Sequence, residues 1–157
     1  MGMRLRIVAL GQRMPAWVDA GFDDYAKRMP REYALELVAL KAAPRNRGKS
    51  VTQMLAAEAE QIRAACATDH VVALDERGSG WTTRDLAAKL ARWRADNTSV
   101  AFVIGSADGL DGAFKRCANE RLAVSSMTLP HGLARIVLAE QLYRAASLLA
   151  GHPYHRE

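Results

Sequence analysis

Short apolar segments alternate along the chain with longer segments of helical periodicity. The apolar segments that predict strands cover residues 4–10, 33–40, 70–75, 99–104 and 121–126. Helices are predicted at 15–29, 51–66, 111–119 and 130–149, with a further helix that begins after Thr82. Such alternation is typical of an α/β protein whose mostly parallel sheet carries helices on both faces. We therefore predict this fold class.

Local signals mark where several elements begin. Ser50 and Gln53 have the spacing of a capping box, which predicts a helix whose apolar positions, Val51 and Cys66 among them, face inward. The glycine-containing stretch 76–81 predicts a turn after the third strand. Residues 41–50 predict a basic loop.

Open parallel sheets bind ligands beyond the carboxyl ends of their strands. The loops to watch therefore follow Leu74, Ile104 and residue 126. The stretch 105–110 contains two glycines, which allow close approach of a ligand to the backbone. Its spacing does not match the dinucleotide-binding pattern, so the loop is either a plain turn or part of a site for an adenosyl ligand without a pyrophosphate.

The length of 157 residues predicts one domain, and the 50% share of hydrophobic residues supports a substantial core. The net charge of +5 favours an anionic partner such as RNA, although such an excess is also ordinary in a soluble protein. The cationic side chains Arg45, Arg47 and Lys49 lie in the basic loop. They predict contacts with RNA phosphates or, alternatively, a solvated loop.

The two cysteines, Cys66 and Cys117, lie far apart and predict reduced, buried thiols. No metal-ligand spacing is present, so we expect no metal site. The chain contains no signal-peptide pattern and no long uncharged apolar run. These features predict a cytoplasmic protein that does not enter a membrane.

Two polar features stand out near the C-terminus. Arg135 falls on the helical face that carries Ala139, Leu142, Ala146 and Leu149, where a charge is costly unless paired. It either reaches the rim or a structural carboxylate, or it holds an anion or a partner subunit. The tail 151–157 contains two histidines, a tyrosine and an arginine, and it is either a frayed end or a catalytic segment.

Several motifs then agree with one family. They are Ile104-Gly105, Asp108-Gly109-Leu110, Met127-Thr128-Leu129-Pro130-His131, Arg135, the run 139–145 and the tail His152-Pro153-Tyr154-His155-Arg156. With these motifs the whole chain resembles the small bacterial SPOUT methyltransferases that methylate N3 of a pseudouridine in helix 69 of 23S ribosomal RNA.

The resemblance implies a C-terminal trefoil knot, a homodimer, and S-adenosyl-methionine as methyl donor. It also implies that the substrate is 23S rRNA within the assembled ribosome. The implied donor-binding residues are Leu74, Gly105, Val124, Ser125, Ser126, Met127, Thr128 and Leu129. The family usually has a second glycine where this chain has Ser106, which puts the affinity for the donor in question.

The tail supplies the residues for the expected chemistry. His155 is the predicted base or proton relay, Arg156 holds a carbonyl oxygen or phosphate, and Tyr154 stacks or donates a hydrogen bond. In the dimer these residues would complete the partner's site. Arg45, Arg47, Lys49 and Arg135 are the predicted RNA contacts. The alternatives are a methyltransferase for another RNA base and a ribosome-associated factor without enzymatic activity.

Overall fold

A five-stranded sheet, in the order β2-β1-β4-β3-β5, forms the middle layer of the molecule, and every neighbouring pair of strands is parallel. The computed structural model describes residues 2–45 and 48–155, with the backbone alone described at residue 155. The strands are β1 (Leu5–Leu10), β2 (Leu35–Leu40), β3 (His70–Gly80), β4 (Val100–Ile104) and β5 (Glu120–Ala123). The predicted parallel α/β fold is therefore confirmed.

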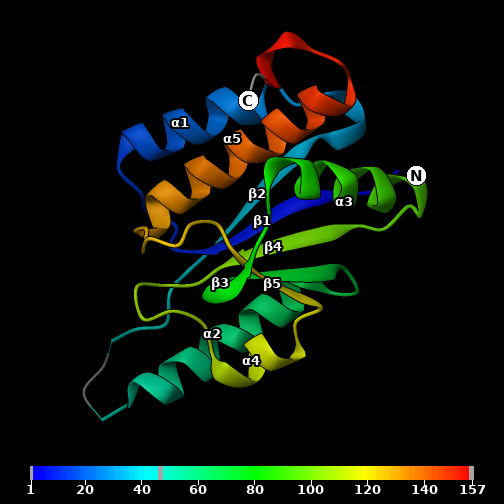
Figure 1. Ribbon diagram of the computed structural model, residues 1–157. Coiled ribbons are helices and arrows are strands. Elements are labelled where there is room, and N and C mark those ends of the chain that lie inside the picture. The colour runs from blue at the N-terminus through cyan, green and yellow to red at the C-terminus, as the bar shows by residue number, and fades with distance from the viewer. Residues whose placement is uncertain (1, 46–47, 156–157) are drawn as a thin grey trace.

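Five α-helices in the described residues cover the two faces of this sheet (Figure 1). They are α1 (Ala16–Ala26), α2 (Val51–Cys66), α3 (Thr83–Ala95), α4 (Gly112–Cys117) and α5 (His131–Leu149). Short 3-10 turns, η1 (Arg31–Tyr33) and η2 (Pro153–His155), complete the set. Helices α1, α3 and α5 share one apolar cluster with the sheet, and α2 and α4 share the other.

The predicted capping signals operate as the sequence indicates. The Ser50 hydroxyl accepts the backbone N–H of Gln53, whose side chain accepts the backbone N–H of Ser50. Thr82 and Asp85 make the same reciprocal pair at the start of α3. Each pair satisfies donors that a helix start leaves unpaired. The structure therefore fixes these two helix starts through local side-chain bonds.

The turn predicted at residues 76–81 is wrong, because β3 continues to Gly80. Its far end pairs with β5 through Ser79 and Gly80, after an irregularity in register that follows Leu74. A side chain at Gly78 would lie 2.7 Å from the backbone of Arg121. The glycine therefore permits close packing of two strands rather than a reversal of the chain.

Three inward placements are also wrong. Val51 and Leu149 are exposed because they are the first residue of α2 and the last residue of α5, beyond the edge of the sheet. Cys117 is exposed at the end of α4, whereas Cys66 is buried as predicted.

No helix in the described part of the chain is long and apolar enough to cross a membrane. The knot stays a prediction.

Candidate functional site

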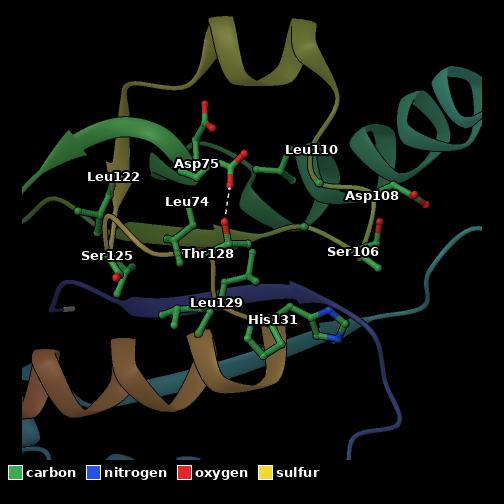
Figure 2. A pocket seen from close by; sticks show the side chains of 18 of the residues that line it. Leu74, Asp75, Ser106, Asp108, Leu110, Leu122, Ser125, Thr128, Leu129 and His131 are labelled. Carbon is green, nitrogen blue, oxygen red and sulfur yellow. Dashed lines mark hydrogen bonds between the residues drawn. The ribbon is translucent and has the colours of Figure 1, made fainter.

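A pocket of about 770 Å³ lies between the middle of β3, the loop that follows β4 and the segment that joins β5 to α5 (Figure 2). One wall is the loop 105–110 that follows β4, and the opposite wall is the segment 124–130 that leads into α5. Leu74, Asp75 and Glu76 of β3 form the base. Two of the three loops that the sequence indicated, those after Ile104 and after residue 126, therefore line the pocket, but no loop follows Leu74, because β3 continues to Gly80.

Most of the predicted donor-binding residues line this pocket. They are Leu74, Gly105, Val124, Ser125, Met127, Thr128 and Leu129. Ser126 is not among the described residues that line the pocket, although both of its neighbours are. The structure thus brings two segments about 20 residues apart in the chain to the same cavity, which is the geometry that the motifs predict.

The loop 105–110 is a tight turn that depends on Gly105. The backbone N–H of Gly109 donates to the Ser106 carbonyl oxygen at 2.8 Å. A side chain at Gly105 would lie 2.5 Å from the Gly109 carbonyl oxygen, which is closer than real contacts allow. Gly109 itself has a φ of +86°, in the left-handed region that glycine favours. Glycine at both positions therefore shapes this wall.

The opposite wall is tied to β3 by a single side-chain bond. The Thr128 hydroxyl donates to the Glu76 carboxylate at 3.1 Å across the pocket, as Figure 2 shows at Thr128. Ser125 accepts the backbone N–H of Met127, which lies exposed at the mouth. This segment has no regular secondary structure, so backbone groups other than the Met127 N–H and the Pro130 carbonyl oxygen, which accepts the Ala134 N–H, can bind a ligand.

Arg45 contacts the pocket wall instead of extending into solvent. Its guanidinium lies 2.8 Å from the Asp108 carboxylate, 3.1 Å from the Ser106 hydroxyl and 3.3 Å from the Glu58 carboxylate. Glu58 is 2% exposed and also accepts the Ser106 hydroxyl at 2.9 Å. The structure therefore makes Arg45 a tether for the loop 105–110, and this position does not support its predicted RNA contact.

Arg135 is enclosed rather than presented to RNA. It is 1% exposed, and its Nη2 donates to the Gly11 carbonyl oxygen at 2.6 Å. Burial lowers the pKa of Arg135. Its hydrogen-bond acceptors are backbone carbonyl oxygens at the end of β1, so the predicted carboxylate or rim contact is wrong. A guanidinium enclosed in this way offers no donor to a phosphate at the surface.

His131 also lines the pocket, although the sequence motif that contains it assigned a role only to Met127, Thr128 and Leu129. Burial, and then the positive charge of Arg135, lower the pKa of His131. Its imidazole is therefore neutral at neutral pH. Asp75, Glu76, Asp108 and Lys115 are further charged lining residues that sequence reasoning did not assign. The rule that ligands lie beyond strand ends would have indicated Asp75, which directly follows Leu74.

The tail lies on α5, away from the pocket. The Tyr154 hydroxyl donates to the Glu140 carboxylate at 2.8 Å, and its ring lies 4.6 Å from the Tyr143 ring. Burial, and then the hydrogen bond to Glu140, raise the pKa of Tyr154, so the phenol keeps its proton. Glu140 follows His131 by nine residues, which places this contact about 13 Å along the helix axis from the pocket.

The remaining predicted residues are placed only in part. Lys49 is exposed just before α2, consistent with a solvent-facing basic loop. Arg47 and Arg156 lie outside the described residues, and only the backbone of His155, in η2, is described. Among the described residues, no group of three His, Cys, Asp or Glu side chains could hold a metal ion.

Comparison with known proteins identifies the family. Residues 3–155 match the model described as predicted SPOUT methyltransferase. The chain is 54% identical over 155 residues to the ribosomal RNA large subunit methyltransferase H of Nitrosospira multiformis, which covers 98% of this chain and 99% of that relative. A protein of the same name from Variovorax paradoxus is 54% identical over 156 residues, covering 99% of this chain and 100% of its own. The chain therefore belongs to the SPOUT methyltransferase family, as the motifs predicted.

A solved structure agrees with the fold. A probable methyltransferase from Bordetella pertussis aligns with a TM-score of 0.60 at 19% sequence identity, covering 92% of this chain and 96% of that one. At this identity the likeness concerns the fold alone.

The pocket suits S-adenosyl-methionine, the methyl donor of this methyltransferase. Its volume of about 770 Å³ falls within the range of roughly 300–1,000 Å³ that small-molecule sites occupy. Leu74, Leu122 and Leu129 supply an apolar lining for an adenine ring. Asp75, Glu76 and Asp108 line the same cavity, and three carboxylates suit a ligand that carries a sulfonium and an ammonium group.

Proposed function

We propose that the protein methylates N3 of a pseudouridine in helix 69 of 23S rRNA, on the assembled ribosome. The observation that carries the proposal is the pocket between the middle of β3 and the loop after β4, lined by seven of the eight residues that the motifs assign to the donor. The relatives named ribosomal RNA large subunit methyltransferase H support the choice of rRNA.

The chain's own groups have two tasks in this reaction. The donor's sulfonium already activates the methyl group, so the protein must align N3 with it and accept the imide proton. Alignment in a closed pocket replaces a bimolecular encounter by a local step. The tail supplies the proton acceptor, His155, and Arg156 holds a carbonyl oxygen or phosphate of the nucleotide.

The tail acts in the pocket of a second copy of the chain. Within one copy, the Tyr154 hydroxyl is bound to Glu140, about 13 Å along α5 from His131. The tail folds back along α5 only as far as Glu140, so Tyr154 does not reach the pocket of its own subunit. A homodimer that presents the tail of one subunit to the pocket of the other satisfies this geometry.

The deciding experiment is mass spectrometry of nucleosides from the 23S rRNA of a strain that lacks this protein. We expect N3-methylated pseudouridine to disappear and to return when the purified protein and S-adenosyl-methionine are added to ribosomes from that strain. An unchanged nucleoside profile would contradict the proposed substrate. A chain that binds ribosomes but gives no heat of binding with S-adenosyl-methionine in calorimetry would support the non-enzymatic alternative.

A further inference from the structure

A second, strongly cationic pocket lies beside the donor site. Its volume is about 370 Å³, and residues of the far end of β3, of β5 and of α4 line it. Strand β5 is the edge strand of the sheet. Among the described residues that line it, Arg77, Lys115, Arg116 and Arg121 are cationic, and Glu120 is the acidic one. The lining is therefore built for a ligand with negative charge.

The acidic group in this pocket is already neutralised by the protein. Glu120 lies 2.6 Å from Lys89 Nζ and 2.7 Å from His70 Nε2. These bonds lower the pKa of Glu120 against the opposing effect of burial, which is the largest single influence. Lys89 and His70 therefore hold the carboxylate of Glu120, which compensates little of the positive charge of the arginines.

The three arginines have no such partners. In the part of the chain that the structure describes, the guanidinium groups of Arg77, Arg116 and Arg121 take part in no ion pair and no side-chain hydrogen bond. All three residues are exposed, and they come from three different elements, β3, α4 and β5. Three unpaired guanidinium groups on one small concavity repel one another unless an anion lies between them.

The two pockets are neighbours. Lys115 of α4 lines both of them, and its Nζ lies 3.8 Å from the Asp75 carboxylate at the base of the donor pocket. An RNA strand with one base in the donor pocket therefore has its adjoining backbone within reach of the arginines. Guanidinium groups bind phosphate oxygens through paired N–H donors, which positions a strand without reading its sequence.

We propose that the pocket formed by Arg77, Arg116 and Arg121 binds a backbone phosphate of the RNA strand next to the nucleotide to be methylated. The inference rests on the proposed function, because it takes the substrate to be RNA. It adds a binding site that the sequence motifs do not include, since Arg77, Arg116 and Arg121 are scattered along the chain and belong to none of them.

The test is the salt dependence of binding to purified large ribosomal subunits from a strain without this protein. A triple variant, Arg77→Gln, Arg116→Gln and Arg121→Gln, is compared with a control that removes three other exposed charges, Lys27→Gln, Arg31→Gln and Arg92→Gln. For each lost phosphate contact, the slope of log K against log salt falls by about 0.7 to 0.9. Because the pocket is proposed to bind one phosphate, we expect a fall of about 0.7 to 0.9 in the first variant and little change in the control.

Kinetics on the same subunits give a second readout. The pocket variant should raise the KM for subunits about tenfold, with kcat and the calorimetric Kd for S-adenosyl-methionine unchanged, which also shows that it is folded. Equal slopes for the two triple variants would overturn the proposal. The proposal would also be overturned if the pocket variant bound the subunits normally but no longer bound ribosomal proteins freed of RNA. The pocket would then bind an acidic protein segment instead of a phosphate. A wild-type protein that methylates no rRNA refutes the proposed function, while the binding slopes still decide the pocket.

Discussion

The N-terminal half of α5 and its C-terminal half, where the tail packs from Glu140 onward, contrast sharply in structure. At its start, His131 and Ala134 line an open pocket whose other walls are loops, and Thr128 supplies a single bond across it. Further along the same helix, Glu140 and Tyr143 form a closed contact with Tyr154 of the tail. The N-terminal half of α5 thus faces a cavity that a ligand can enter. In the C-terminal half, Glu140 and Tyr143 are already in contact with the Tyr154 side chain of the same chain.

The contrast explains how the predicted site is divided. The donor-binding segments and the tail were both expected to act on one nucleotide, yet about 13 Å of α5, from His131 to Glu140, separates them. Helices of this length do not fold back on themselves. A complete site therefore needs the pocket at the start of α5 from one copy and the tail from a second copy. Each prediction below tests one of these two parts.

Removal of the tail should have the largest effect. A chain that ends at Gly151 loses the proposed proton acceptor and the proposed guanidinium, so methylation of ribosomes should fall by a factor of about 100 or more. The Kd for S-adenosyl-methionine should change little, because no described residue of the tail lines the donor pocket. Methylation assays and calorimetry on the same preparation check both values.

Mixing experiments show whether the two ends act in different subunits. Gly105→Ala damages only the pocket, so a mixed dimer with the shortened chain contains one intact site. If the subunits exchange, an equal mixture of the two impaired variants, assayed at an S-adenosyl-methionine concentration well below the Kd of Gly105→Ala, should gain about a quarter of the wild-type rate over their own residual activity. No recovery despite exchange, shown by mass spectrometry of the mixed dimers, would contradict a shared site.

Gly105→Ala by itself should mainly weaken donor binding. The new methyl group would lie 2.5 Å from the Gly109 carbonyl oxygen, so the loop 105–110 must open. We expect the Kd for S-adenosyl-methionine to rise about tenfold or more and the free energy of unfolding to fall by about 1–3 kcal/mol. Gly80→Ala is the matched control, because a side chain there meets no atom within 4 Å. If calorimetry gives equal Kd values for the two variants, the loop 105–110 does not contribute to the binding of S-adenosyl-methionine.

Features that depend on local sequence were predictable. The Ser50 cap uses a residue three positions away, and the apolar runs that became β1 and β4 are fully buried. The pocket was found because parallel strands bring their carboxyl ends to one edge whatever their detailed packing. This rule needs only the order of strands and helices.

Features that depend on distant partners were not predictable. β3 extends past Leu74 because β5, about 45 residues later, pairs with its far end. Arg45 looked like a free cation in a basic loop, and only the fold brings Ser106 to it from 61 positions away. Arg135 takes its carbonyl acceptors from the end of β1, 124 and 125 positions earlier. Periodicity indicates which face a residue occupies, but it does not name the atoms that it meets.

Arg45→Ala tests the tether at the pocket end and should have a smaller effect. Glu58, 2% exposed, would keep only the Ala43 N–H and the Ser106 hydroxyl as donors. Because Arg45 is itself 39% exposed, we expect a loss of about 1–2 kcal/mol in the free energy of unfolding, measured by urea denaturation. The Kd for S-adenosyl-methionine should rise a few-fold, as the loop 105–110 loosens.

The control for this prediction is Lys41→Ala, which removes an exposed cation from the same loop. If Arg45 instead contacts RNA, as the sequence alone suggested, the result is different. Arg45→Ala would then reduce the salt slope of subunit binding by about 0.9 and leave the donor Kd unchanged.

The smallest effect concerns pH and the imidazole at the pocket end. Burial and Arg135 lower the pKa of His131 in the folded protein, so the unfolded chain takes up the proton more readily. As the pH falls through the ordinary histidine value of about 6.5, this difference destabilises the wild type. The substitution His131→Asn removes this difference in proton uptake. The Tm of the variant should therefore fall less than that of the wild type between about pH 7.5 and pH 5.5. His152→Asn, at the tail end, controls for the loss of one imidazole. If wild type and His131→Asn lose equal Tm on acidification, His131 is open to water in solution, and the start of α5 is less enclosed than its packing against Arg135 implies.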